Sequence, residues 1–277
     1  MRRRNDWRAV CAERCKHGSE GGVQKPGLET VQGAGRLPNK TTTTVNLAYG
    51  LARAGRRVLV VDTDAQSNST YSLLGNLDQD PTLFDVLFNN ARLADIIVST
   101  RQERLYLAPS SIDLSAADML MASATGRERR LKRALAPVAE HFDYILIDTP
   151  PNLGIITINA FIACTEVIIP IALTTYALIG INILERTMQE LRDNLDVPLP
   201  IFGVVANLDD HMRISAEMVQ AVREHYGDLV FRTVIPRNIK VEEAHNQVAI
   251  LYEYAPASTG ARAYESLVQE VLSRAEH

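Results

Sequence analysis

Residues 40–68, KTTTTVNLAYGLARAGRRVLVVDTDAQSN, decide the fold because they join an amphipathic helix to a buried strand. Apolar residues recur at helical spacing over residues 41–54, and Gly55 follows as an expected C-terminal cap. The next run, VLVVD at 58–62, is continuously apolar and ends in a carboxylate. Such a run is typical of a strand buried on both faces of a parallel sheet. The stretch therefore predicts a helix that packs against a parallel β-strand.

The same alternation of strand and helix continues through the rest of the chain. Further strands are predicted at 105–109, 144–148, 166–172, 201–207 and 229–235. Helices are predicted near 82–90, 113–121, 127–140, 177–193, 215–226 and 259–275. This order predicts an α/β fold, a mostly parallel twisted sheet with helices on both faces in three α/β/α layers. Ligands of such sheets bind at the carboxyl ends of the strands.

Composition places limits on the setting and the partners of the chain. Its 277 residues hold 46% hydrophobic residues, enough for a large core, and only three cysteines, so a disulfide framework is not expected. We expect a cytoplasmic location. The formal net charge of -4 means that binding to nucleic acid or to anionic membranes needs a local basic patch. No apolar run is long enough for a membrane-spanning helix.

Lys40 and Thr41 stand at the start of the first predicted helix, as they do at the end of a phosphate-binding loop. There the helix N-terminus and backbone N–H groups hold phosphate, the lysine reaches the β- and γ-phosphates, and the threonine hydroxyl binds Mg²⁺. The alternative is a threonine-rich helix start without a ligand. The strands that follow favour the phosphate site.

Three carboxylates follow predicted strands. Asp62 and Asp64 end the strand of residues 58–62, and Asp148 ends YILID at 144–148, in the arrangement of a Walker B acid. Acids in these places serve a hydrated Mg²⁺ and an attacking water. A solvated strand-end acid is the alternative for each one alone. Their convergence at one edge of the sheet favours a shared site.

The chain resembles the ParA/Soj family of chromosome and plasmid partition ATPases, within the deviant Walker A class of P-loop NTPases. The resemblance extends over nearly all of residues 40–273. Its most specific strings are residues 40–68, FDYILIDTPPNLGIITINAF at 142–161 and FRTVIPRNIKVEEA at 231–244. The family implies ATP and Mg²⁺ as cofactors. By this resemblance Lys40 would bind the β- and γ-phosphates, and Thr42 the α-phosphate.

The resemblance also assigns the remaining site residues. Thr41 would bind Mg²⁺, with Asp62 and Asp148 supporting the metal shell. Asp64 would position the hydrolytic water, so Asp64 and Lys40 are the expected catalytic residues. The strand-end residue Asn207 and the later Pro236 match positions that border the adenine.

Members of the family form ATP-dependent dimers that bind DNA without sequence specificity, and a ParB-type partner stimulates hydrolysis. The resemblance thus implies a homodimer associated with the nucleoid. Candidate DNA-binding residues here are Arg213, Arg237 and Lys240. A MinD-like membrane ATPase is an alternative, but the terminal segment YESLVQEVLSRAEH lacks the basic amphipathic character that such proteins need.

Residues 1–39 depart from the family, which reads K-G-G-V-G-K-T in the phosphate loop after an apolar strand. Here residues 35–39 read GRLPN, so bulky side chains and a proline stand where glycines curl around phosphate. The segment 20–23, EGGV, offers a second alignment of the loop start. No run in residues 1–39 predicts a buried strand, so the first strand is expected to be missing or replaced.

These departures divide the chain into an atypical, disordered leader at 1–39 and an ATPase domain at 40–277. One hypothesis is that residues 1–39 are not the ancestral start, through a frameshift, a wrong start codon or a rearrangement. Another is that the chain is an inactive remnant of the family. Sequencing the upstream DNA tests the first hypothesis, and ATP turnover tests the second.

Overall fold

The computed structural model describes residues 8–12, 40–152, 154–173, 177–195, 197–208 and 212–276. Within them, one sheet has the strand order β3-β4-β2-β5-β1-β6-β7-β8, parallel except for the pair β3 and β4. Its strands are β1 (Arg8–Ala12), β2 (Val58–Asp62), β3 (Val98–Ser99), β4 (Leu105–Ala108), β5 (Tyr144–Asp148), β6 (Glu166–Leu173), β7 (Ile201–Leu208) and β8 (Val230–Ile235).

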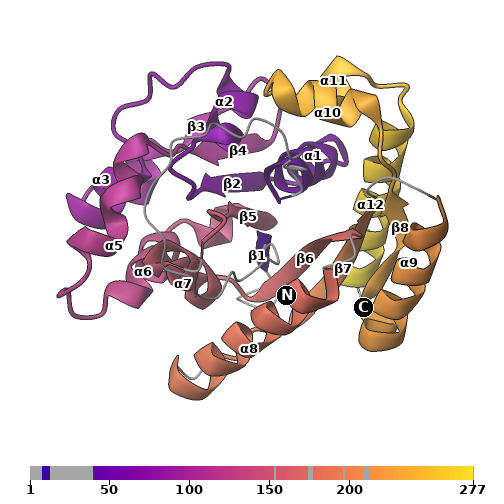
Figure 1. Cartoon of the computed structure of the whole chain (residues 1–277). Coiled ribbons are helices and arrows are strands. Elements are labelled where there is room, and N and C mark those ends of the chain that lie inside the picture. The colour runs from indigo at the N-terminus through magenta and orange to yellow at the C-terminus, as the bar shows by residue number, and fades with distance from the viewer. Residues whose placement is uncertain are drawn as a thin grey trace, which may run out of the picture.

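Helices cover both faces of this sheet, which confirms the three-layer α/β/α architecture (Figure 1). The α-helices are α1 (Lys40–Arg53), α2 (Asn68–Leu74), α3 (Leu83–Phe88), α4 (Leu93–Ile96), α5 (Ala117–Leu120), α6 (Arg130–Leu135), α7 (Ile155–Ala163), α8 (Ala177–Leu195), α9 (Met212–Tyr226), α10 (Ile239–Asn246), α11 (Leu251–Tyr254) and α12 (Thr259–Ala275). Short 3₁₀ turns are η1 (Ile112–Ala116), η2 (Arg127–Arg129), η3 (Ala139–His141) and η4 (Gly227–Leu229).

The strand β2 shows how the sequence builds two cores. Every residue of β2 is buried, and successive side chains point to opposite faces of the sheet. Leu59 and Val61 join the core that packs under α3 to α9, whereas Val58 and Val60 join the core under α1, α2 and α10 to α12. This two-sided burial explains the uninterrupted apolar run.

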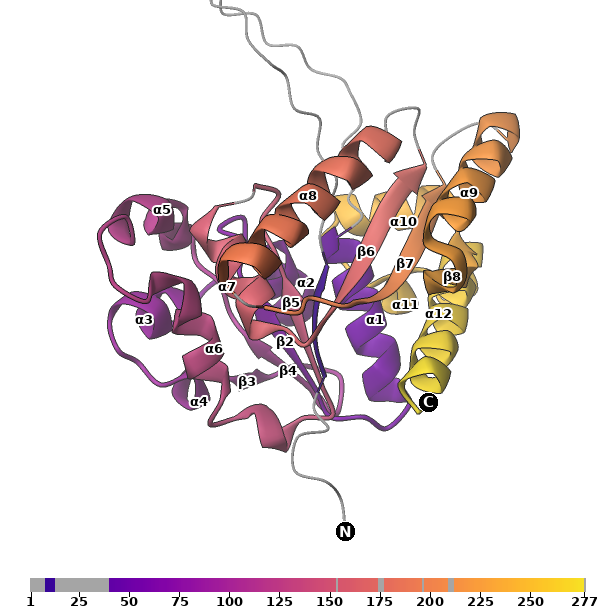
Figure 2. The same cartoon turned by 90° about the horizontal axis from the view of Figure 1, so that it is seen from below.

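The central strand β1 corrects the expectation that residues 1–39 hold no buried strand. Residues 8–12, RAVCA, pair in parallel with β5 on one side and with β6 on the other (Figure 2). The apolar run AVCA is short and made mostly of small residues, which gives it a weak β-propensity signal. The unpaired ladder groups of β5 and β6 supply the missing preference. Residues 1–7 and 13–39, including the glycine-poor loop, lie outside the described residues.

The other differences from the expected elements are local. The strand at 144–148 has the predicted bounds, and the remaining predicted strands differ by one residue at an end. The helix expected at 113–121 is a 3₁₀ turn followed by α5, and that expected at 127–140 is divided among η2, α6 and η3. The two-residue edge strand β3 and the helices α10 and α11 were not predicted because they are short.

The terminal helix α12 belongs to the core. Its buried residues Tyr264, Leu267 and Val271 join the core on the α1 side of the sheet, and α12 packs against α1 and β8. Its apolar face is therefore used inside the protein. Among the helices of the described ranges, none combines the length and the apolar character needed to cross a membrane.

Candidate functional site

Two aspartates meet at the carboxyl edge of the sheet, where two neighbouring parallel strands end. Asp62 is the last residue of β2 and Asp148 the last of β5, and the two occupy the same register position. Both side chains are completely buried. The structure thus brings together two carboxylates that the sequence predicted separately.

The carboxylate of Asp62 is held by hydrogen bonds on both oxygens. Its Oδ2 accepts from the backbone N–H and the hydroxyl of Thr70, at 2.8 and 2.7 Å. Its Oδ1 accepts from the backbone N–H of Asp64 at 3.1 Å. Burial raises the pKa of Asp62 most, and the nearby Asp148 raises it further, against the lowering effect of Thr70. Asp62 is a fixed part of the site.

Asp148 is less completely satisfied. Its Oδ2 accepts from the Ser69 hydroxyl at 2.7 Å, while its buried Oδ1 lacks a hydrogen-bond partner within the described part of the chain. Burial raises the pKa of Asp148, and the Ser69 hydroxyl, the charge of Lys40 and the nearby Thr41 oppose that rise. A buried anionic oxygen without a partner is costly unless a cation or a donor arrives.

The N-terminus of α1 lies beside this pair. Lys40 begins the helix, and its buried Nζ donates a hydrogen bond of 2.6 Å to the carbonyl of Pro150, just after β5. Thr41 is half-buried and Thr42 is buried at the same helix start. A helix N-terminus and a lysine attract a phosphate group. Residues 35–39, which would complete such a loop, lie outside the described ranges.

Asp64 occupies a tight turn after β2. Its backbone N–H binds Asp62, its Oδ1 accepts from the backbone N–H of Gln66 at 3.0 Å, and its carbonyl accepts from the Ser110 hydroxyl at 2.7 Å. The side chain of Asp64 is half-buried, in contrast to the two fully buried aspartates. The turn therefore holds a partly accessible carboxylate next to the buried pair.

Sequence reasoning missed a layer of hydroxyl groups behind these acids, formed by Ser69, Thr70 and Ser110. Besides binding Asp62, the hydroxyl of Thr70 accepts from the backbone N–H of Ser110 at 3.0 Å. Ser69 and Thr70 lie in α2, and Ser110 follows β4. The available signal was their position after strand ends, but serine and threonine are too common there to stand out.

Asn207 and Pro236 lie farther along the same edge. Asn207 lies near the end of β7 in register with Ile235, the last residue of β8, and Pro236 follows directly. The two candidate residues are therefore neighbours in space. The buried Nδ2 of Asn207 has no hydrogen-bond partner among the residues that the structure describes.

The candidate DNA-binding residues are placed differently. Arg237 precedes α10 and its Nε binds Glu242 at 2.8 Å, while Lys240 lies in α10 and its Nζ binds Glu243 at 2.7 Å. Both basic residues are at the surface, and each has a carboxylate partner. Arg213 lies in α9, but its side chain is outside the described residues.

The strand-end arrangement is suited to a phosphate with a divalent cation. Mg²⁺ in proteins is bound by one or two carboxylates together with substrate phosphates and water. In the described residues, no group of three or more His, Cys, Asp or Glu side chains forms an all-protein metal site. A cation here would draw its remaining ligands from a hydroxyl, from water or from a phosphate.

Comparison with known proteins gives the same picture from sequence. A family model described as an AAA domain matches residues 36–201. The chain is 41% identical over 238 residues to the sporulation initiation inhibitor protein Soj of Bacillus subtilis, covering 84% of this chain and 93% of the relative. It is 37% identical over 241 residues to the chromosome partitioning protein ParA of Caulobacter vibrioides, covering 85% and 90%.

Solved structures share the fold. Cobyrinic acid a,c-diamide synthase of Mycobacterium smegmatis, with bound ADP and magnesium, has a TM-score of 0.76 at 29% identity, covering 98% of this chain and 96% of that one. The cell division ATPase MinD of Pyrococcus furiosus has a TM-score of 0.73 at 26% identity, covering 96% and 98%. These similarities extend over nearly the whole chain.

Proposed function

Because the chain belongs to the Soj/ParA family of P-loop ATPases, we propose that it binds ATP with Mg²⁺ at the strand-end site and hydrolyses the γ-phosphate. The observation that carries this proposal is the junction of Lys40, Asp62 and Asp148, three groups contributed by α1, β2 and β5. Hydrolysis of this kind depends on positioning and charge neutralisation rather than on covalent chemistry.

Lys40 and the start of α1 would bind the phosphates. The lysine charge would neutralise the β- and γ-phosphates, the Thr42 region would take the α-phosphate, and the helix N-terminus would add backbone donors. The Nζ of Lys40 at present binds the carbonyl of Pro150. A phosphate would therefore replace a neutral acceptor by a doubly charged one, which favours transfer of the lysine.

Asp148 and Thr41 fit a magnesium ion. The partnerless Oδ1 of Asp148 offers a buried anionic ligand, and Thr41 at the helix start offers a hydroxyl. Asp62 would support this shell through its fixed carboxylate. Bound Mg²⁺ would neutralise charge on the β- and γ-phosphates and so lower the barrier to transfer.

Asp64 would hold the attacking water in line with the γ-phosphate. Its carboxylate is half-buried and its backbone is fixed to Asp62 and Ser110, so the group is positioned before a substrate binds. Such preorganisation reduces the entropy lost on reaching the transition state. Asp64 is therefore the residue whose removal should reduce turnover more than binding.

Asn207 and Pro236 would border the adenine. An asparagine amide is able to bind adenine at its N6 and N7 positions, and the free Nδ2 of Asn207 supplies the donor for this contact. Pro236, which lies next to the end of β7, would provide an apolar face for the ring. A mutation of Asn207 should weaken ATP binding with little effect on GTP binding.

In the cell, the chain would act in chromosome or plasmid partition as an ATP-dependent homodimer that binds DNA without sequence preference. Arg213, Arg237 and Lys240 would contribute to DNA binding, and a ParB-type partner would stimulate hydrolysis. We place the protein in the cytoplasm, associated with the nucleoid. Burial of the apolar face of α12 disfavours the MinD-like membrane alternative.

The test is ATP turnover by the purified full chain at saturating Mg²⁺. Lys40→Ala should weaken nucleotide binding and turnover together, whereas Asp64→Ala should lower turnover by about 100-fold and leave binding intact. Lys132→Ala, which removes an exposed lysine from α6, is the matched control and should behave as the unmodified protein.

Equal turnover by the unmodified chain and Lys40→Ala would contradict the ATPase proposal. The departure from the family at residues 35–39 makes this comparison necessary, because the glycines that wrap the phosphates are absent from that segment. In that outcome the chain would be an inactive member of the family.

A further inference from the structure

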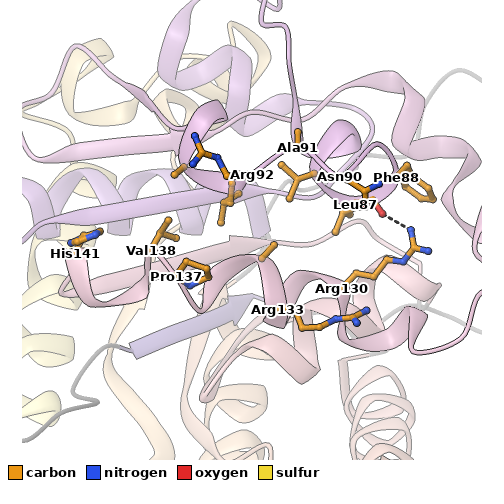
Figure 3. A pocket seen from close by; sticks show the side chains of 14 residues that line it. Leu87, Phe88, Asn90, Ala91, Arg92, Arg130, Arg133, Pro137, Val138 and His141 are labelled. Atoms are coloured by element: carbon orange, nitrogen blue, oxygen red, sulfur yellow. Dashed lines mark hydrogen bonds between the residues drawn. The ribbon is translucent and has the colours of Figure 1, made fainter.

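A cavity of about 790 Å³ lies on the outer side of the helical layer, away from the strand-end site. Figure 3 shows it between two walls, with Leu87 and Ala91 facing Arg130 and Arg133 of α6. None of its lining residues is one of the aspartates or the lysine of the strand-end site. The size is within the usual range for small-molecule sites.

The lining is basic. Four basic side chains, Arg92, Arg130, Arg133 and His141, are among the residues that surround the cavity, and no acidic residue is. Arg92 is neutralised by Asp95, with bonds of 2.8 and 2.6 Å. The remaining two arginines therefore determine the charge of the cavity.

Arg130 and Arg133 donate to main-chain carbonyls. Arg130 reaches across the cavity to the carbonyl of Leu87, and Arg133 donates to the carbonyl of Gly126 at 3.1 Å. A carbonyl group satisfies an N–H but leaves the guanidinium charge uncompensated. Each guanidinium also has further N–H donors for a second partner.

The floor and one end of the cavity are apolar. Leu87, Leu93 and Val138 are buried beneath it, and Phe88 lies with its ring 5.7 Å from the guanidinium of Arg130. Pro137 adds a further apolar wall. A ligand that fills this space needs an apolar body as well as an anionic group.

We propose that this cavity is a binding site for a small organic anion, one that carries a phosphate, sulfonate or carboxylate group on an apolar ring. The anionic group would lie between Arg130 and Arg133, which present two guanidinium groups from adjacent turns of α6. The ring would pack on Leu87 and against Phe88. A DNA backbone would use the charges but leave this walled apolar space unfilled, so a small molecule fits the cavity better.

The probe for this site is 8-anilinonaphthalene-1-sulfonate, an aromatic sulfonate whose fluorescence rises when it is bound. We expect saturable binding to the full chain without nucleotide. The double variant Arg130→Gln/Arg133→Gln should weaken binding by about tenfold, the effect of losing one charge-assisted contact. The uncharged analogue N-phenyl-1-naphthylamine should bind the unmodified protein correspondingly weakly.

Three controls separate binding from folding. Arg129→Gln/Arg223→Gln removes the same charge from exposed positions outside the cavity and should leave the affinity unchanged. Arg133→Gln alone alters an exposed side chain and should reduce the affinity without changing the thermal unfolding temperature. Ala94→Trp, at the exposed rim, should block the probe while retaining both arginines.

Equal affinity of the probe for the unmodified protein and the Arg130→Gln/Arg133→Gln variant would overturn the proposal. So would loss of DNA retention in that variant with unchanged probe binding, because the face would then be a nucleic-acid surface. Neither measurement depends on ATP, so the result is independent of the proposed ATPase activity.

Discussion

The strand-end site and the surface around α10 hold opposite charges in opposite ways. At the strand ends, Asp62 and Asp148 are completely buried next to each other, which raises the pKa of both carboxyl groups. At α10, Arg237 and Lys240 are exposed and each is paired with a glutamate. Burial makes the first arrangement costly to keep, whereas exposed ion pairs contribute little to stability.

This difference indicates that the buried pair is retained for a ligand rather than for the fold. An apo protein that keeps two adjacent buried carboxylates is strained at that position. A cation at the partnerless oxygen of Asp148 would relieve this strain. The surface pairs around α10 need no ligand, so their effect should be modest and adjustable by charge.

The largest expected effect comes from removing the charge of Asp148. Asp148→Asn keeps the side-chain volume and the bond from Ser69, but it removes the anionic ligand, so ATP turnover should fall by about 100-fold or more. The free energy of unfolding of the ligand-free protein should stay the same or rise. Asp143→Asn, an exposed aspartate just before β5, is the control and should leave turnover unchanged. A parallel fall in stability and turnover would contradict this account.

The next effect concerns the hydroxyl layer. Thr70→Val removes the hydroxyl that donates to Asp62 and accepts from the N–H of Ser110, with almost no change of volume. We expect the free energy of unfolding to fall by about 1–3 kcal/mol, because buried polar groups lose a partner. Ser266→Ala, which removes an exposed hydroxyl from α12, should change it little. Urea denaturation measures both, and equal effects would contradict the role of Thr70.

The buried pair also predicts a pH dependence of stability. Because the pKa of Asp62 is raised in the folded protein, the folded state binds more protons than the unfolded state above about pH 4. Stability of the ligand-free protein should therefore decrease as pH rises from about 4 toward neutrality. Asp62→Asn should flatten this decrease. A stability that rises over the same range and is unaffected by Asp62→Asn would oppose the assigned pKa shift.

The smallest effects are expected at α10. If Arg237 and Lys240 bind DNA phosphates, Glu242→Gln/Glu243→Gln should strengthen DNA retention by freeing them from their partners. Arg237→Gln/Lys240→Gln should weaken retention and reduce the salt dependence by about two charges. Stability should change by less than about 0.5 kcal/mol in both variants. Identical DNA retention in the two variants would remove these residues from the interface.

Sequence patterns predicted the parts of the fold where burial is long and continuous. The runs that form β2 and β5 were predicted because apolar residues fill every position and an aspartate ends each run. β1 was missed because RAVCA is short and made mostly of small residues, and its structure depends on pairing with β5 and β6. Tertiary context decided that segment.

The candidate site was predicted to the same extent. Lys40, Asp62 and Asp148 were found because charged residues are rare at the ends of buried elements. Ser69 and Thr70 were missed because hydroxyl side chains are common in turns, so only the hydrogen bonds to the aspartates reveal their role. The arginines of α6 were missed because a cavity between helices leaves no periodic signal in sequence.

A crystal structure of the full chain with a nonhydrolysable ATP analogue and Mg²⁺ tests the central claim most directly. The account predicts that the Nζ of Lys40 leaves the carbonyl of Pro150 for the β- and γ-phosphates, and that Asp148 lies in the shell of the bound Mg²⁺. A structure in which the analogue binds elsewhere, while Lys40 keeps its bond to Pro150, would contradict it.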